Sequence, residues 1–236
     1  MNCSISIFSP SSVSCYRPPP GHGSIGAIAG GSRRQDEEGV EDMLGSSERE
    51  RVHTRRIVCE AFRRRDGLWE IEATVIDEKG EDMPFRSRPM VRPGQSLHDI
   101  TIAVLIDDDA VIHDVAARMQ TVPWAACPES QAAYRRLIGL QIGAGFMREV
   151  RERVGGVAGC THLTDLLVQV GNTYTQAIWP TLIARQFAAE PDPRKWTDRR
   201  AVGFVGGCAA WRQDGDTLRQ EYPELAAEFV AKRDET

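Results

Sequence analysis

The sequence predicts an α+β fold in which antiparallel β-hairpins come first and helices follow, packed on one face of the sheet. Between residues 56 and 118, apolar and polar side chains alternate with the period of two that is typical of half-buried strands. From Cys127 onward, apolar residues recur at spacings of three and four, which indicates amphipathic helices. Because the strands are grouped before the helices, the pattern disfavours an alternating, doubly wound sheet.

The 236 residues are expected to form one folded domain preceded by a tail. Hydrophobic residues make up 41% of the chain, which is enough for one sizeable core. Residues 1–50 are rich in Ser, Gly and Pro and then in mixed charge, so we expect a disordered tail there and a single α+β domain over 51–236. Met43 is an alternative start. The short apolar stretch at the amino terminus does not fit a signal peptide, and we expect a cytoplasmic protein.

Two β-hairpins are expected at the start of the domain. The alternating runs 56–62 and 68–76 flank Asp66-Gly67, a dipeptide typical of hairpin turns. The runs 98–106 and 111–118 form the second pair around an acidic turn at 107–110, where short acidic side chains tolerate the backbone angles.

Helices and one further hairpin are expected after the strands. The first helix begins at Cys127 with Pro128 in its first turn, and a second spans 146–154 between glycines. A long helix over 161–187 is expected to bend at Pro180. The segment 208–223 contains another Asp-Gly pair and predicts a C-terminal hairpin extension, followed by a short helix.

Composition excludes several classes of function. The net charge of −5 argues against a general nucleic-acid binder, and no apolar run reaches the ~18 residues that a membrane span needs. Six cysteines are too few for a disulfide-built scaffold in a chain of this length. No glycine-rich phosphate loop is present, so no nucleotide cofactor is expected. The oligomeric state is left open.

Polar side chains that can bind metals occur at three element boundaries. His98 and Asp99 open a predicted strand, Cys127 opens a predicted helix, and Cys160 with His162 opens the long helix. A helix start favours thiolate, the form of cysteine that binds metal. The alternative is a purely structural role, because free cysteine is usually buried and a histidine can simply begin a strand. No Cys-x-x-Cys pair is present to decide between the two.

The stretch from Arg56 to Tyr222 resembles a bacterial family built on a domain of unknown function. The resemblance is carried by RRRDGLWEIEATVIDEK, PGQSLHDITIAVLIDDD, PWAACPES, YRRLIGLQIGAGF and, most specifically, GGVAGCTHLTDLL. Members of this family often occur beside genes for aromatic or acyl-CoA catabolism. The resemblance therefore implies a role in a catabolic pathway without implying a reaction.

The order of motifs over residues 97–172 also resembles the iron–sulfur scaffold (NifU/IscU-like) fold. In this resemblance Asp99 matches the ligand aspartate of that family, and Cys127 and Cys160 match its second and third cysteines. Leu97 and Gly159 depart from the pattern, since they replace its first cysteine and its histidine. The resemblance implies that the three matching residues converge on one pocket.

A zinc or iron site is expected from this convergence. The expected metal ligands are Asp99, Cys127, Cys160 and His162, and His98 or Cys208 are further candidates for the set. Loss of the first cysteine disfavours a labile cluster, because thiolates are the preferred cluster ligands.

We therefore expect a metal-binding protein that acts on a small acyl or aromatic metabolite, as a hydrolase or lyase. His98 is the candidate acid/base, and Arg65 is the candidate anchor for an anionic substrate. The alternatives are an iron–sulfur or sulfur-transfer scaffold and a non-catalytic accessory subunit that binds a partner enzyme.

Overall fold

The computed structural model describes residues 48–196 and 202–234. The tail expected over 1–50, with the alternative start at Met43, lies almost entirely outside the described residues. The chain from Glu50 onward forms one compact unit. Among the described helices, none is long and apolar enough to cross a membrane.

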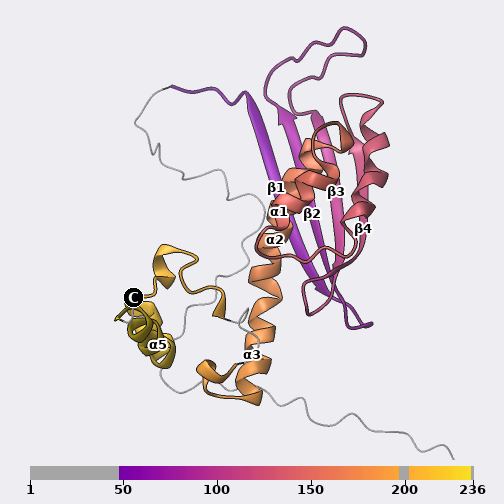
Figure 1. The fold of residues 1–236 in the computed structure, drawn as a ribbon. Coiled ribbons are helices and arrows are strands. Elements are labelled where there is room, and N and C mark those ends of the chain that lie inside the picture. Colours follow the sequence, from indigo (N-terminus) through magenta and orange to yellow (C-terminus); the bar gives the residue numbers. More distant parts are fainter. Residues whose placement is uncertain (1–47, 197–201, 235–236) are drawn as a thin grey trace, which may run out of the picture. The chain divides into compact units, whose positions relative to one another are not determined.

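A four-stranded antiparallel sheet forms the first half of this unit (Figure 1). Its strands are β1 (His53–Arg63), β2 (Trp69–Lys79), β3 (Ser96–Ile106) and β4 (Ile112–Thr121), and they lie side by side in chain order. Both predicted hairpins are confirmed, as is the α+β class.

One face of the sheet carries the core. Alternate residues of β2 and β3 point to this face and are almost fully buried: Trp69, Ile71, Ala73, Val75, Ile100, Ile102, Val104 and Ile106. The helices that follow the sheet cover this face (Figure 1). They are η1 (Cys127–Leu137), α1 (Phe146–Val154) and α2 (Thr161–Ala177), and α2 adds buried leucines at 163, 166 and 167.

The long helix expected over 161–187 is interrupted close to Pro180, where a bend was expected. The α2 helix ends at Ala177, and α3 (Trp179–Ala189) begins with Pro180 in its first turn. Proline at this point lacks the N–H that would continue the hydrogen-bond ladder, so the chain restarts as a new helix.

The C-terminal hairpin expected over 208–223 is wrong. The described residues of this segment form η5 (Ala209–Trp211) and α4 (Asp216–Glu221), and α5 (Pro223–Asp234) follows. Gly215 precedes α4, whose residues favour helix and whose acidic first turn suits the helix dipole. Leu218 and Leu225 then bury themselves in a second small apolar cluster with Trp196. Helical packing of these leucines overrides the Asp-Gly turn signal.

The hydroxyl of Tyr134 holds the start of α2. This fully buried side chain donates to the carbonyl of Cys160 at 2.6 Å and accepts from the N–H of the same residue at 3.0 Å. It also contacts the Thr164 hydroxyl at 2.8 Å. Since Tyr134 lies on η1, these bonds fix the first turn of α2 against the segment that covers β4.

A glycine allows this close approach. A Cβ atom on Gly159 would lie 2.2 Å from the Val154 carbonyl oxygen and 3.0 Å from the Tyr134 hydroxyl. The GGVAG segment between α1 and α2 therefore has a steric reason for glycine at its last position.

We predict that Gly159→Ala lowers the free energy of unfolding by about 1–3 kcal/mol, because the added methyl group has no room. Gly143→Ala is the matched control, since nothing lies within 4 Å of a Cβ at that position. Urea denaturation of both variants measures the difference. Equal stability of the two variants would contradict the described packing around Tyr134.

Candidate functional site

A buried carboxylate interrupts the apolar inward-facing row of β2. Asp77 follows Val75 on the same face of the strand, yet only 1% of its surface is exposed. Directly opposite it in the sheet stand Arg55 on β1 and His98 on β3. A charged group this deeply buried needs partners, because desolvation of an unpaired carboxylate is costly.

Both oxygens of Asp77 have hydrogen-bond donors. Arg55 binds the carboxylate in a bidentate manner, with Nε 2.7 Å from Oδ1 and a terminal nitrogen 2.8 Å from Oδ2. His53 Nε2 lies 3.1 Å from Oδ1, and His98 Nδ1 lies 3.0 Å from Oδ2. An ionised carboxylate only accepts, so His98 donates through Nδ1 and keeps an unprotonated Nε2 when its ring is neutral.

Irregular pairing surrounds His98. The register shifts between Asp77 and Glu78, where Leu97 is the extra residue of β3, and again just beyond Asp99, where Gln120 is the extra residue of β4. Bulges bend a strand locally and change the direction of its side chains, and they are frequent beside functional sites. The end of the sheet that carries Asp77 and His98 is therefore irregular, whereas β2 and β3 pair regularly where they form the core.

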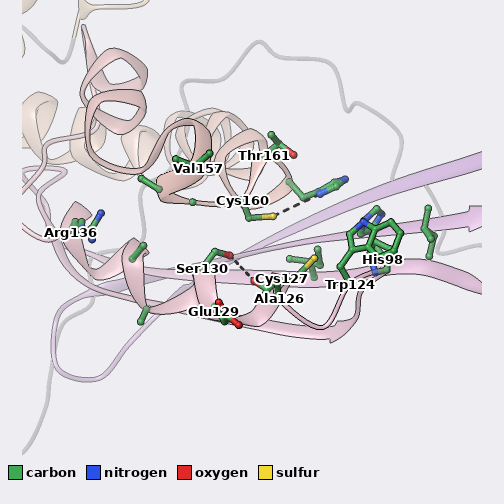
Figure 2. A pocket seen from close by; sticks show the side chains of 18 of the residues that line it. His98, Trp124, Ala126, Cys127, Glu129, Ser130, Arg136, Val157, Cys160 and Thr161 are labelled. Carbon is green, nitrogen blue, oxygen red and sulfur yellow. Dashed lines mark hydrogen bonds between the residues drawn. The ribbon is translucent and has the colours of Figure 1, made fainter. Parts of the chain in front are cut away.

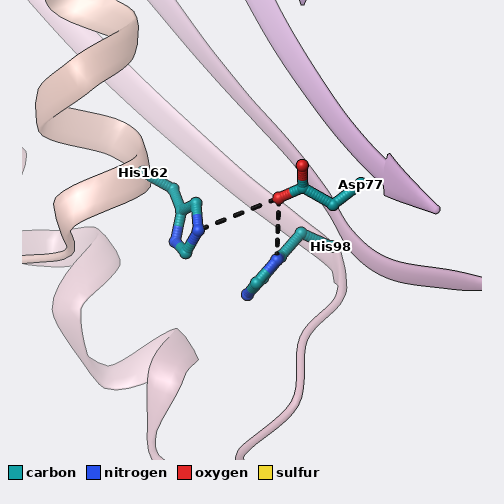
Figure 3. Close-up of side chains that lie close together, drawn as sticks. All are labelled: Asp77, His98 and His162. Atoms are coloured by element: carbon teal, nitrogen blue, oxygen red, sulfur yellow. Dashed lines mark hydrogen bonds and ion pairs between the residues drawn. The ribbon is translucent and has the colours of Figure 1, made fainter. Parts of the chain in front are cut away.

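A second histidine approaches the carboxylate from α2. His162 Nε2 lies 3.9 Å from Asp77 Oδ2, and the rings of His98 and His162 lie 3.9 Å apart between centroids (Figure 3). The other ring nitrogen of His162, Nδ1, lies 3.8 Å from the sulfur of Cys160. Asp77, His98 and His162 each offer a metal-ligand atom, and these atoms lie within 4.8 Å of one another.

The electrostatics keep the carboxylate charged and the rings neutral. Burial raises the pKa of Asp77, but the hydrogen bond and charge of Arg55, with hydrogen bonds from His53 and His98, outweigh it and lower that pKa to about 2. Burial and repulsion from His162 lower the pKa of His98. Burial and the charge of Arg55 lower the pKa of His162. The lowered pKa values favour the neutral form of both rings, and neutral imidazole is the form that binds metals.

The two histidines line a large pocket (Figure 2). Its volume is about 1270 Å³, and its wall comes from the loop after β2, the start of β3, the segment from Pro123 through η1, and the residues around the start of α2. Apolar residues dominate the lining: Met83, Phe85, Leu97, Ile100, Pro123, Trp124, Ala126, Ala132, Ala133, Val157 and Ala158. Cys127 and Cys160 also line it, as do the polar side chains of Glu129, Ser130, Arg136 and Thr161. A mostly apolar pocket with a few convergent polar groups is the usual form of a small-molecule site.

The structure brings four of the expected site residues to this pocket: His98, Cys127, Cys160 and His162. Asp99 is not among the lining residues. Consecutive residues of a strand face opposite sides, so Asp99 lies on the face of the sheet away from His98.

Arg65 also lies away from the pocket. It belongs to the turn between β1 and β2, whereas Asp77 lies near the other end of β2, roughly 27 Å along the strand at ~3.4 Å per residue. The arginine that the structure places at the site is Arg55, whose side chain contacts Asp77 directly.

The interpretation of the sequence missed Asp77. The first hairpin was expected to end at Ile76, one residue short, so the aspartate was not counted on the core face. Every second residue from Trp69 onward is buried, and this alternation continues through Ile71 and Val75 to Asp77. An acidic residue at an inward position of an otherwise apolar row is the signal that identifies it.

We predict that Asp77→Asn lowers the free energy of unfolding by about 1–3 kcal/mol. The amide cannot accept from all four donor groups, although Arg55, whose side chain is 42% exposed, keeps its charge solvated. Asp114→Asn is the control, because that carboxylate is half exposed in a surface pair with Arg135 and should change stability by less than about 0.5 kcal/mol. Comparable losses in chemical denaturation would contradict a special role for Asp77.

We also predict a pH dependence of stability in metal-free protein. Because the pKa values of His98 and His162 are lowered by folding from 6.5, the unfolded chain binds more protons. Their contribution to stability is therefore complete above about pH 6.5 and is lost as the pH falls below it. The melting temperature should drop more between about pH 7.5 and 5.5 in wild type than in a His98→Asn/His162→Asn variant. His113→Asn, at an exposed histidine, should retain the wild-type drop, and equal drops in all three proteins would refute the assignment.

Comparison with known proteins gives a family and no function. No curated protein and no solved structure matches the chain closely enough to indicate a relationship, so the likeness to the iron–sulfur scaffold fold remains a prediction. One family model matches residues 53–176, from the start of β1 almost to the end of α2, and it includes every residue of the site described above. The chain therefore belongs to the family described as "Protein of unknown function (DUF2889)".

Proposed function

We propose that this protein binds a zinc or iron ion between His98 and His162 and acts on a small acyl or aromatic metabolite in the adjoining pocket. One observation carries the proposal: ligand-type atoms of Asp77, His98 and His162 lie within 4.8 Å of one another, and the two histidines line a mostly apolar pocket. Metal sites require such convergence from separate elements, and these residues come from β2, β3 and α2.

Asp77 supports the metal from behind the histidines in this proposal. The guanidinium of Arg55 covers both of its oxygens at 2.7 and 2.8 Å, and a metal ion on the same oxygens would meet that positive charge. Metal-binding histidines usually donate their second nitrogen to a carboxylate, which fixes the ring and makes it a stronger ligand. The bond from His98 Nδ1 to Asp77 has this form and leaves Nε2 for the metal.

Cys160 is the proposed third ligand, although it lies outside the group of Asp77, His98 and His162 whose ligand atoms are within 4.8 Å of one another. The nitrogen of His162 that faces away from Asp77 is Nδ1, and the Cys160 sulfur lies 3.8 Å from it. Bond lengths of about 2.3 Å for Zn–S and about 2.05 Å for Zn–N at a tetrahedral angle separate sulfur from nitrogen by about 3.6 Å. Cys160 and His162 are therefore spaced to hold one ion, whereas a shared ion with His98 also requires the Cys160 side chain to move closer to that ring. Tyr134 fixes the backbone of Cys160.

Three protein ligands leave one position open toward the pocket, which is the pattern of catalytic zinc sites. A metal bound there would polarise a carbonyl group or lower the pKa of a bound water molecule. The apolar wall excludes bulk water from a bound metabolite and strengthens these interactions. This chemistry suits the hydrolysis or lyase reactions expected from the sequence.

The first test is elemental analysis of protein purified without a tag. We predict about one zinc or iron ion per chain in wild type, and loss of most of that metal in His98→Ala and His162→Ala, since each removes a ligand. Asp77→Asn should weaken metal affinity by roughly 10–100-fold, as expected for a residue that orients a ligand.

His113→Ala provides the matched control, because this exposed histidine lies on the hairpin at the other end of β3 and should leave the metal content unchanged. Circular dichroism of every variant checks that the fold is retained. Wild-type metal content in folded His98→Ala and His162→Ala would disprove the site.

An iron–sulfur or sulfur-transfer protein is the second candidate, favoured by the presence of Cys127 and Cys160 in one pocket. The placement of Asp99 on the other face of the sheet weighs against this candidate, since the scaffold resemblance gives that residue a ligand role. Equal amounts of iron and acid-labile sulfide, with visible absorption, would favour it over the mononuclear centre. Protein without any metal would instead favour the accessory-subunit hypothesis.

A further inference from the structure

We propose that the pocket selects a planar aromatic carboxylate and that Trp124 is the surface on which the ring of this ligand stacks. The ring selectivity depends on the pocket wall alone. The position of the carboxylate rests on the proposed metal centre, whose open coordination site faces the same pocket.

Trp124 has an unusual environment for an indole. Its surface is 51% exposed, whereas Trp69 and Trp196 are 6% and 2% exposed. Trp179 and Trp211 are also more buried than Trp124. An exposed large aromatic side chain is informative when it borders a cavity, and Trp124 lines the pocket together with His98 (Figure 2).

Neighbouring side chains hold the indole in position. The ring of Phe85 meets Trp124 edge-on, with centroids 5.4 Å apart and an interplanar angle of 79°. Arg88 lies over Phe85 at 4.8 Å and donates to the carbonyl of Val122 at 3.1 Å. These contacts join the loop after β2 to the end of β4. A wall fixed before binding reduces the ordering cost that a ligand must offset.

The remaining lining leaves room for a ring system. Small residues on η1 and before α2 (Ala126, Ala132, Ala133, Ala158 and Gly159) leave space across the pocket, whose volume of about 1270 Å³ accommodates more than one ring. A flexible acyl chain would gain apolar burial there but no ring stacking, which adds to the affinity of an aromatic pair beyond its buried area. The polar lining consists of His98, His162, Thr161, Ser130, Glu129 and Arg136. The ligand carboxylate is placed at His98 and His162 because the proposed metal centre lies there.

The experiment compares 2-naphthoate with its saturated analogue, decahydro-2-naphthoate, by isothermal titration calorimetry on the full chain. Both carry a carboxylate and a similar carbon frame, and they differ in planarity and π-electrons. We expect 2-naphthoate to bind roughly three- to tenfold more tightly, the range that one stacking contact provides. Trp124→Leu should abolish this preference, and Trp124→Phe should retain part of it.

Trp179→Leu is the control, since Trp179 packs against Phe204 and does not line this pocket. Melting temperatures confirm that each variant is folded. Binding of neither compound, equal affinity for both, or a preference that survives in Trp124→Leu would overturn the inference.

Titrations of metal-free and zinc-loaded protein separate this inference from the metal proposal. If the metal centre is correct, zinc should increase the affinity for 2-naphthoate through its carboxylate, and His98→Ala should cancel that gain. If the protein binds no zinc, the preference for the planar ring should still be present and still depend on Trp124. Zinc binding without any ring preference would refute only the inference made here.

Discussion

The ion pair between the buried carboxylate of Asp77 and the partly exposed guanidinium of Arg55 is the interaction on which the site depends. Asp77 occupies a core position of β2, where an unpaired charge would cost several kcal/mol, and Arg55 on the neighbouring strand compensates it with two short hydrogen bonds. With its charge secured, the carboxylate can orient His98 on the next strand. Arg55, Asp77 and His98 lie on three neighbouring strands and thus form one polar row across the end of an apolar sheet face.

The second half of the site depends on how α2 is attached to the sheet. Its leucines at 163, 166 and 167 bury themselves in the core and set the distance of the helix from the strands. Tyr134 and Gly159 then fix its first turn, which places His162 near the carboxylate and Cys160 beside the other ring nitrogen of His162. Apolar packing and one tyrosine hydroxyl therefore bring a helix terminus to the polar row, and the polar groups themselves have little part in folding the helix.

Much of this architecture follows from periodicity in the sequence. The alternation of residues 56–118 predicts the four strands, and the spacing after Cys127 predicts helices whose longest is interrupted close to Pro180. Element boundaries also indicated His98, Cys160 and His162, because these residues stand where a strand or helix begins. Local patterns were misleading at the C-terminus, where the Asp-Gly signal at Gly215 yielded to burial of Leu218 and Leu225.

The partners of the histidines could not be assigned from motif order alone. Asp99 is adjacent to His98 in sequence, but the alternation of a strand places the two on opposite faces. Asp77 is distant in sequence, yet the antiparallel register sets it directly opposite His98. Register depends on which strands pair and where bulges fall, and neither is encoded in the spacing of a motif.

X-ray absorption spectroscopy at the metal edge of zinc-loaded protein tests the central claim most directly, because it identifies the atoms that bind the ion. The account predicts one sulfur ligand at about 2.3 Å with nitrogen ligands at about 2.0–2.1 Å, and loss of the sulfur contribution in Cys160→Ser but not in Cys127→Ser. Asp77→Asn should leave the ligand types unchanged, since the carboxylate acts through His98. A spectrum with no sulfur ligand, or with an oxygen ligand that disappears in Asp77→Asn, would contradict the account.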